Sequence, residues 1–268
     1  WAVRKATAKK KQDFSKAWDG KFVAFCFMAT LLSISLVALM SMALKDKSQR
    51  GEFIQGAYRS SAAILGIAFI TNIYGNSGMA PLMIIGSVPL YNIMAVLVLS
   101  FTKPGQNGMS PELLKKTLKG IVTNPIILGI LAGALWSLLR LPMPTILSKT
   151  VSNLGSLTTP LGLMTMGAAF NWGEAKTGMG PAFVASFMKL FGLCTLFLPV
   201  AVLLGFREAE LIAILVMLGS STTVSSYVMA RNMGHSGVLS SSIVAITTLG
   251  SAFSLTFWLY VLKTLALI

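Results

Sequence analysis

The sequence predicts an all-α, polytopic membrane protein, and composition, apolar run length and an internal repeat lead to this fold class. Apolar residues make up 54% of the 268-residue chain, charged residues 11%, and the mean hydropathy is +0.75. A soluble domain carries about 25% charged residues, so lipid is the main solvent of this chain. Its apolar runs are close to the length of about 20 residues that one membrane-spanning helix needs.

Eight apolar runs are long enough to cross a bilayer, and the connections between them are short, which predicts one bundle. The runs are Trp18–Leu44, Phe53–Gly75, Met79–Thr102, Leu118–Leu139, Ile146–Phe170, Pro181–Gly205, Ala209–Met233 and Val238–Ile268. The basic residues 1–17 have no apolar core and no cleavage site, so they predict an amino-terminal arm and not a signal peptide.

Two stretches of the chain repeat each other. They begin at Ser61 and Ser220, an offset of 159 residues, and both end on a G-x-S-G turn, at Gly78 and Gly237. The same offset carries the first three spans onto the last three and leaves the fourth and fifth without partners. Complete repeats would be five-helix units, with two helices expected ahead of Trp18. Units with an odd number of helices lie inverted relative to each other, as in many transporters.

The repeat divides the chain into four parts. Residues 1–17 form the basic arm and 18–102 the last three helices of repeat one. Residues 103–117 form a cytoplasmic linker and 118–268 the five helices of repeat two. Pro89 and Pro160 fall inside the third and fifth spans, where we expect interruptions because proline removes a backbone hydrogen bond.

Hydroxyl residues gather at matching depths in the second and seventh spans. Ser60 and Ser61 lie in one, and six of the seven residues Ser220–Ser226 in the other. Small hydroxyl residues commonly allow close helix packing, but a dense run also competes with the helix for backbone groups. We therefore expect both spans to break, near 62–66 and 221–225, and to cross near the bilayer midplane. The amino termini of the resulting half-helices attract anions.

The charges have two interpretations. A net charge of +14 is compatible with nucleic-acid binding, but in a membrane protein Lys and Arg collect in cytoplasmic loops; we expect no nucleic-acid partner. Arg59 and Lys189 lie inside spans, where a charge costs at least about 2.5 kcal/mol. Each either reaches the interface or a helix-end carbonyl, or presents its charge to an anion.

The remaining polar residues argue against catalysis. All eight acids lie in loops or at span ends, which disfavours a cation pump and a carboxylate proton relay. No Ser/His/Asp set or acid/base pair is present in the sequence. With one His and two mid-span cysteines, Cys26 and Cys194, we expect no metal, no cofactor and no enzyme activity.

Five segments resemble a known family when they are taken together. They are Gly56–Ser61 with Leu65–Ile67, Val88–Asn92, Thr123–Pro125, Pro160–Leu163 with Gly167, and Val224–Arg231. In these segments the chain resembles the auxin efflux carrier family, which includes plant PIN-type carriers and bacterial malate and malonate permeases. The resemblance implies two inverted five-helix units whose fourth and ninth helices, here the second and seventh spans, break and cross at the substrate site. It also implies that both termini lie outside.

We therefore expect a secondary active transporter that moves a small organic anion, a carboxylate, by alternating access. The expected substrate-binding residues are Arg59, Ser60, Ser61, Asn92, Asn124, Lys189, Ser220, Ser221 and Thr222. The expected partners are the anion and the lipid bilayer, and a homodimer is also compatible with the sequence. The expected location is the cytoplasmic membrane of a bacterium. The alternative is a sensor or scaffold that keeps the transporter fold without transporting.

Overall fold

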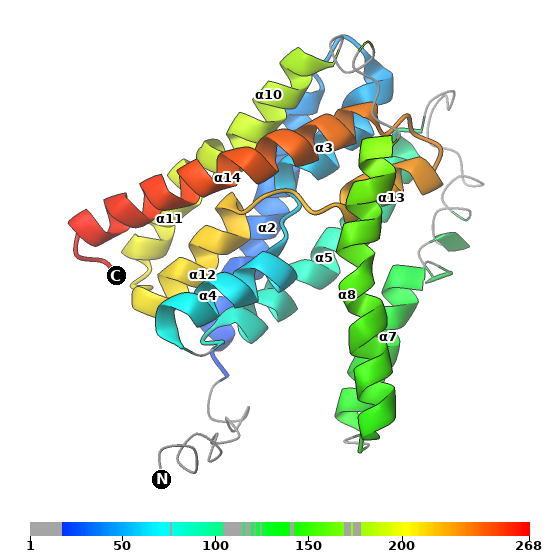
Figure 1. Ribbon diagram of the computed structural model, residues 1–268. Coiled ribbons are helices and arrows are strands. Elements are labelled where there is room, and N and C mark those ends of the chain that lie inside the picture. The colour runs from blue at the N-terminus through cyan, green and yellow to red at the C-terminus, as the bar shows by residue number, and fades with distance from the viewer. Residues whose placement is uncertain are drawn as a thin grey trace.

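The computed structural model describes residues 18–75, 77–103, 115, 119–120, 122–123, 125–139, 142–168, 173 and 178–268. The expected arm and most of the expected linker lie outside this part of the chain. Within it, four helices are long and apolar enough to cross a membrane. They are α2 (Gly20–Ser41), α5 (Ala80–Phe101), the helix that runs from α10 (Met179–Phe187) through the π-helical turn η3 (Met188–Gly192) into α11 (Leu193–Leu203), and α14 (Val238–Thr264) (Figure 1).

The second and seventh expected spans are both broken. The 3₁₀ turn η1 (Lys47–Gln49) leads into α3 (Arg50–Tyr58), which is followed by the π-helical turn η2 (Ala62–Gly66) and α4 (Ile67–Tyr74). The seventh span consists of α12 (Glu208–Gly219) and α13 (Ser225–Asn232). The second of the two breaks lies where the hydroxyl run predicts it. The first lies earlier than predicted, at residues 59–61, because the chain re-enters a helical conformation, as a wide π turn, at Ala62.

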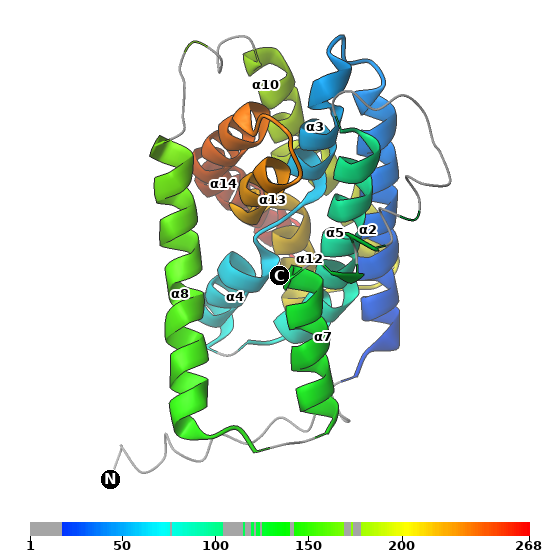
Figure 2. The ribbon, with the colours of Figure 1, turned by 90° about the vertical axis from the view of Figure 1, so that its right-hand side faces the viewer.

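A pair of helices stands to one side of the bundle. α7 (Pro125–Leu138) and α8 (Thr145–Ala168) lie on the right of the other helices in Figure 1, and Figure 2, which views the molecule from that side, shows the two helices apart from each other. Within α8, which the structure describes throughout, the only buried residue is Gly162. A Cβ added there would lie 2.7 Å from Val224 Cγ1, so α8 touches the second break at this point.

Two of the expected proline interruptions are wrong. Pro89 lies inside the continuous helix α5, and Pro160 lies inside α8. Proline removes one backbone hydrogen bond and its ring clashes with the preceding turn, which strains a helix without always ending it. Neighbouring groups can satisfy the freed carbonyl, so proline alone does not end a membrane helix.

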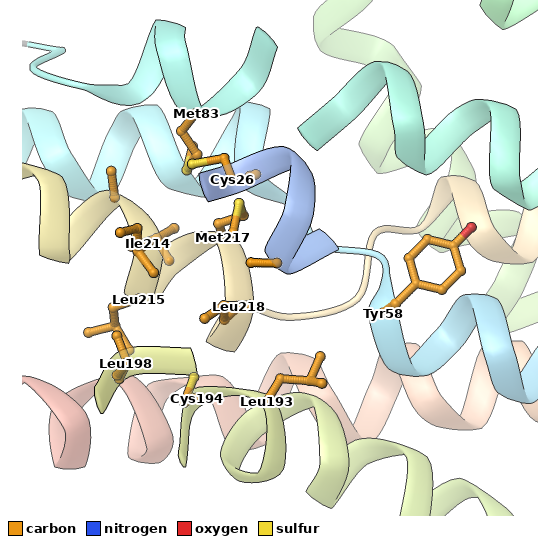
Figure 3. Packing of buried hydrophobic residues seen from close by; sticks show 14 of the residues in the cluster. Cys26, Tyr58, Met83, Leu193, Cys194, Leu198, Ile214, Leu215, Met217 and Leu218 are labelled. Atoms are coloured by element: carbon orange, nitrogen blue, oxygen red, sulfur yellow. The ribbon is translucent and has the colours of Figure 1, made fainter. Parts of the chain in front are cut away.

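The first half of the seventh span forms the centre of the bundle. Every residue of α12 from Leu211 to Gly219 is buried. Figure 3 shows this helix between Cys26 and Met83 on one side and Cys194 and Leu198 on the other. A helix that is apolar all round is stable where it is enclosed on all sides, and α12 holds its last residue, Gly219, inside this enclosure, directly before the break.

α2 and α11, which the 159-residue offset pairs, run in opposite directions, because the start of α2 lies beside the end of α11. Lys21 Nζ, at the start of α2, donates to Leu204 O, just after the end of α11, at 2.5 Å. The Phe22 and Phe25 rings also contact the Phe206 ring, with centroids 5.8 and 5.2 Å apart. In addition, α2 packs against α3 and α5, and the paired α10–α11 segment packs in the same way against α12 and α14.

A buried acid joins the two halves at one end of the bundle. Glu52, in the first turn of α3, is 1% exposed. Its Oε1 accepts hydrogen bonds from Ser236 Oγ at 3.0 Å and Gly237 N at 2.9 Å, and its Oε2 accepts one from Ser240 N at 2.8 Å. The cap residue of α14, Gly237, has no side chain to do this. Glu52 therefore caps the amino terminus of α14 from another helix.

Candidate substrate site

The two breaks meet each other through the backbone. After Tyr58 ends α3, Arg59 is extended, with φ −67° and ψ 141°. Ser220 is extended in the same way after α12, with φ −73° and ψ 162°. Ser61 N donates to Ser221 O at 3.0 Å, so the two extended segments cross in contact. Each break leaves helix-end backbone groups that have no partner within their own helix.

Hydroxyl side chains satisfy part of these helix ends across the crossing. Ser60 Oγ hydrogen-bonds Ser220 Oγ and also donates to Val216 O of α12 at 3.3 Å. In return, Thr222 Oγ1 donates to Gly56 O of α3 at 2.7 Å. Each half therefore supplies a hydroxyl that bonds near the carboxyl end of the other half's helix, where Val216 O also accepts from Ser220 N at 3.1 Å. This explains physically why hydroxyl residues recur at matching depths in the two halves.

Arg59 is a buried cation whose partners are neutral. It is 3% exposed. Its Nη2 donates to Asn92 Oδ1 at 2.9 Å and to Ser225 Oγ at 3.0 Å, and its Nη1 lies 3.2 Å from Met229 Sδ. Its Nε has no partner among the described residues. A guanidinium suits a carboxylate because it offers several donors in one plane.

Lys189 contacts the residue before the first break from another helix. Its side chain is fully buried and comes from the π-helical turn η3. Its Nζ donates to Tyr58 O at 3.3 Å and to Met217 O at 3.4 Å. Both acceptors are backbone oxygens near the carboxyl ends of α3 and α12.

The described acids are all at helix ends. Asp19 caps α2, Asp46 caps η1, and Glu52 caps α14. Glu208 and Glu210 lie in the first turn of α12. None of these five carboxylates makes an ion pair with Arg59 or Lys189. In the described part of the chain, the crossing therefore has an excess of positive charge.

Most of the predicted site residues come together in the structure. Lys189 adjoins the crossing from η3. The residues that lie at the crossing or bond to it are Arg59, Ser60, Ser61, Asn92, Ser220, Ser221 and Thr222. Asn124 lies outside the described residues.

Four other residues at the crossing are not among those that the sequence predicts for the site. Ser225 belongs to the hydroxyl run, and only its contact with Arg59 distinguishes it from its neighbours. Gln55, whose Nε2 donates to Ser226 O at 2.8 Å, had a usable signal because it is a polar residue inside a span. Thr247 Oγ1 accepts from Thr222 N at 3.0 Å, and Met229 contacts Arg59; neither carries a sequence signal of its own.

The described residues contain no group of three or more His, Cys, Asp or Glu side chains that could hold a metal ion. Cys26 and Cys194 are both buried as free thiols. The polar chemistry of the crossing is hydrogen bonding and positive charge, which suits binding and release of a ligand.

Two broken helices that cross inside a multi-pass helical bundle are typical of membrane transporters built from internal repeats. The family model described as "Membrane transport protein" matches residues 20–259, nearly the whole chain, and the chain belongs to this family. This match confirms the resemblance to the auxin efflux carriers and makes the protein a multi-pass transporter and not an enzyme. Comparison with curated proteins gives no significant match.

Proposed function

We propose that this protein is a secondary active transporter of a small organic anion, a carboxylate, and that the anion binds at the crossing of the two broken helices. The observation that carries the proposal is Arg59, a buried arginine whose partners among the described residues are all neutral. A buried charge is costly unless it is paired. A substrate carboxylate can supply that pairing during each transport cycle.

The neighbouring groups suit a carboxylate. The guanidinium can turn its donors from Asn92 and Ser225 toward a bidentate ligand, because neutral partners hold it less strongly than an acid would. The two extended segments also carry hydroxyl and backbone N–H donors, on Ser60, Ser61, Ser220, Ser221 and Thr222. Lys189 adds positive charge at short range. We keep Asn124 among the proposed substrate-binding residues because it is a polar residue within the fourth span of the sequence.

We also propose that the fold is a ten-helix inverted repeat of two five-helix units. The antiparallel directions of α2 and α11, the matched packing within each half and the contact of the two breaks support this proposal. In such transporters the substrate site lies at the repeat interface, and alternating access comes from movement of one group of helices against the other. The resemblance to bacterial permeases favours a bacterial cytoplasmic membrane.

The experiment that tests the function is uptake of labelled carboxylates by the purified protein in proteoliposomes. A panel of mono-, di- and aromatic carboxylates is compared with a neutral amide of similar size. We expect saturable uptake of at least one carboxylate. Arg59→Gln should raise its KM by about tenfold or more, because one charge-assisted hydrogen bond contributes roughly 1.5–3 kcal/mol.

Arg231→Gln is the matched control. Arg231 lies in the last turn of α13, is exposed, and donates to Ser236 O outside the crossing. The same chemical change there should leave KM near its original value. If no carboxylate is taken up, the proposal fails and a sensor or scaffold role gains support. If Arg59→Gln transports with unchanged KM, Arg59 is not the anion's partner.

A further inference from the structure

Lys189 is bound differently from Arg59, which indicates a different role. Its two acceptors are main-chain oxygens, Tyr58 O on the last residue of α3 and Met217 O near the end of α12. The last four carbonyls of any α-helix have no donor within that helix. They also form the negative end of the helix dipole, which is stabilised by a cation. Two such ends converge on one ammonium group.

The other helix-end carbonyls at the crossing have neutral donors. Gly56 O accepts from Thr222 Oγ1, and Val216 O accepts from Ser60 Oγ. Met217 O also accepts from Tyr91 Oη at 3.3 Å. Lys189 is therefore the one charged group, among those described, that bonds to both carboxyl ends.

The position of Lys189 in the sequence explains how it reaches both ends. It lies in the π-helical turn η3, which widens the helix between α10 and α11. A side chain of another helix stabilises this turn, because Trp258 Nε1 of α14 donates to Leu190 O at 3.1 Å. π-turns are frequent where a helix presents a side chain for function.

We propose that Lys189 is a positioning residue that acts as a tethered cation: it neutralises the converging carboxyl ends of α3 and α12 and so holds the crossing together without a bound metal cation. The proposal concerns the assembly of the crossing and does not depend on which substrate is transported. Sodium ions and other small cations should therefore have no specific effect on the intact protein.

The test is whether a small cation restores the thermal stability of a variant that lacks the Lys189 ammonium group. Lys189→Ala removes the ammonium and leaves space for ethylammonium, and the thermal unfolding midpoint is measured in detergent. We expect the variant to unfold roughly 5 °C or more below the original protein. Ethylammonium chloride should recover a clear part of this loss, whereas choline chloride at equal concentration, which controls for ionic strength, should not.

Leu190→Ala is the matched control, because Leu190 is the next residue and only 5% exposed. It creates an apolar cavity without removing a charge, so ethylammonium should leave its midpoint unchanged. Equal rescue of both variants, or no rescue of Lys189→Ala, would overturn the proposal. So would a specific increase in the midpoint of the original protein with sodium chloride.

A second variant covers the case in which Lys189→Ala does not fold. Lys189→Met fills nearly the same space without charge, and we expect its midpoint to lie below that of the original protein. A midpoint equal to the original would overturn the proposal. Because these measurements need no substrate, failure here leaves the proposed transport function untouched, and absence of carboxylate uptake leaves this proposal untouched.

Discussion

Replacing Glu52 by glutamine tests how firmly the first broken helix is tied to α14. The carboxylate is buried and accepts three hydrogen bonds at 2.8–3.0 Å, two of them from backbone N–H groups at the start of α14. The substituted amide keeps the shape of the side chain but replaces one acceptor oxygen by an NH₂ group. Since that group faces a donor whichever way the amide is turned, at least one bond is lost.

The expected magnitude follows from these contacts. Losing one hydrogen bond to a charged acceptor costs roughly 1.5–3 kcal/mol, and an unsatisfied buried donor adds to it. A change of 1 kcal/mol shifts the unfolding midpoint of a chain of 150–250 residues by about 2–4 °C. We therefore expect Glu52→Gln to lower the midpoint by roughly 3–12 °C. Glu52→Ala should lower it further because all three bonds are lost.

The assay is thermal unfolding in detergent, followed by tryptophan fluorescence. Glu210→Gln is the control, since Glu210 also lies in the first turn of a helix but accepts only a long bond, 3.4 Å, from Arg207 N. It should shift the midpoint much less than Glu52→Gln. Equal midpoints for Glu52→Gln and the original protein would refute the reasoning that the carboxylate caps α14 in the folded state.

Two further predictions concern packing and topology. Gly162→Ala should lower the midpoint and the uptake rate because its Cβ would lie 2.7 Å from Val224 Cγ1, whereas Gly155→Ala on the same helix, with no atom within 4 Å, should not. Equal effects would show that α8 does not approach the second break. In a background without Cys26 and Cys194, a membrane-impermeant maleimide should label Lys47→Cys and Leu204→Cys from opposite sides of the membrane. Labelling of both from one side would contradict the inverted repeat.

The sequence predicts the breaks because a dense hydroxyl run is a local pattern and the repeat places hydroxyl residues at the matching position in the other half. Hydroxyl groups that compete for backbone partners favour a break wherever they are dense, and the second break at 220–224 lies within that run. The first break has only Ser60 and Ser61 to mark it, and its position differs from the prediction by a few residues. The wide turn η2 that follows it depends on packing against α5 and α12, which no local pattern contains.

Glu52 shows the limit of reasoning from position along a span. An acid at a span end is expected to face water, and five described acids do lie at helix ends. Glu52 is buried nevertheless, because the start of α14 lies against α3 and has only glycine at its cap position. The sequence contains both parts of this contact, Glu52 and the G-x-S-G turn, but no periodicity relates residues that lie 185 positions apart.

The sequence alone does not distinguish the roles of the two buried cations, whereas their contacts in the structure do. Arg59 and Lys189 are both positive, both buried and both without a carboxylate partner in the described residues. Lys189 bonds to main-chain oxygens, whose positions are fixed by the helices that carry them, so its charge is used within the fold. Arg59 bonds to Asn92, Ser225 and Met229, whose side chains can rotate and whose neutral groups compete weakly for a guanidinium. A carboxylate entering the crossing would therefore displace the partners of Arg59 more readily than those of Lys189. For this reason we assign recognition of the anion to Arg59 and stabilisation of the crossing to Lys189.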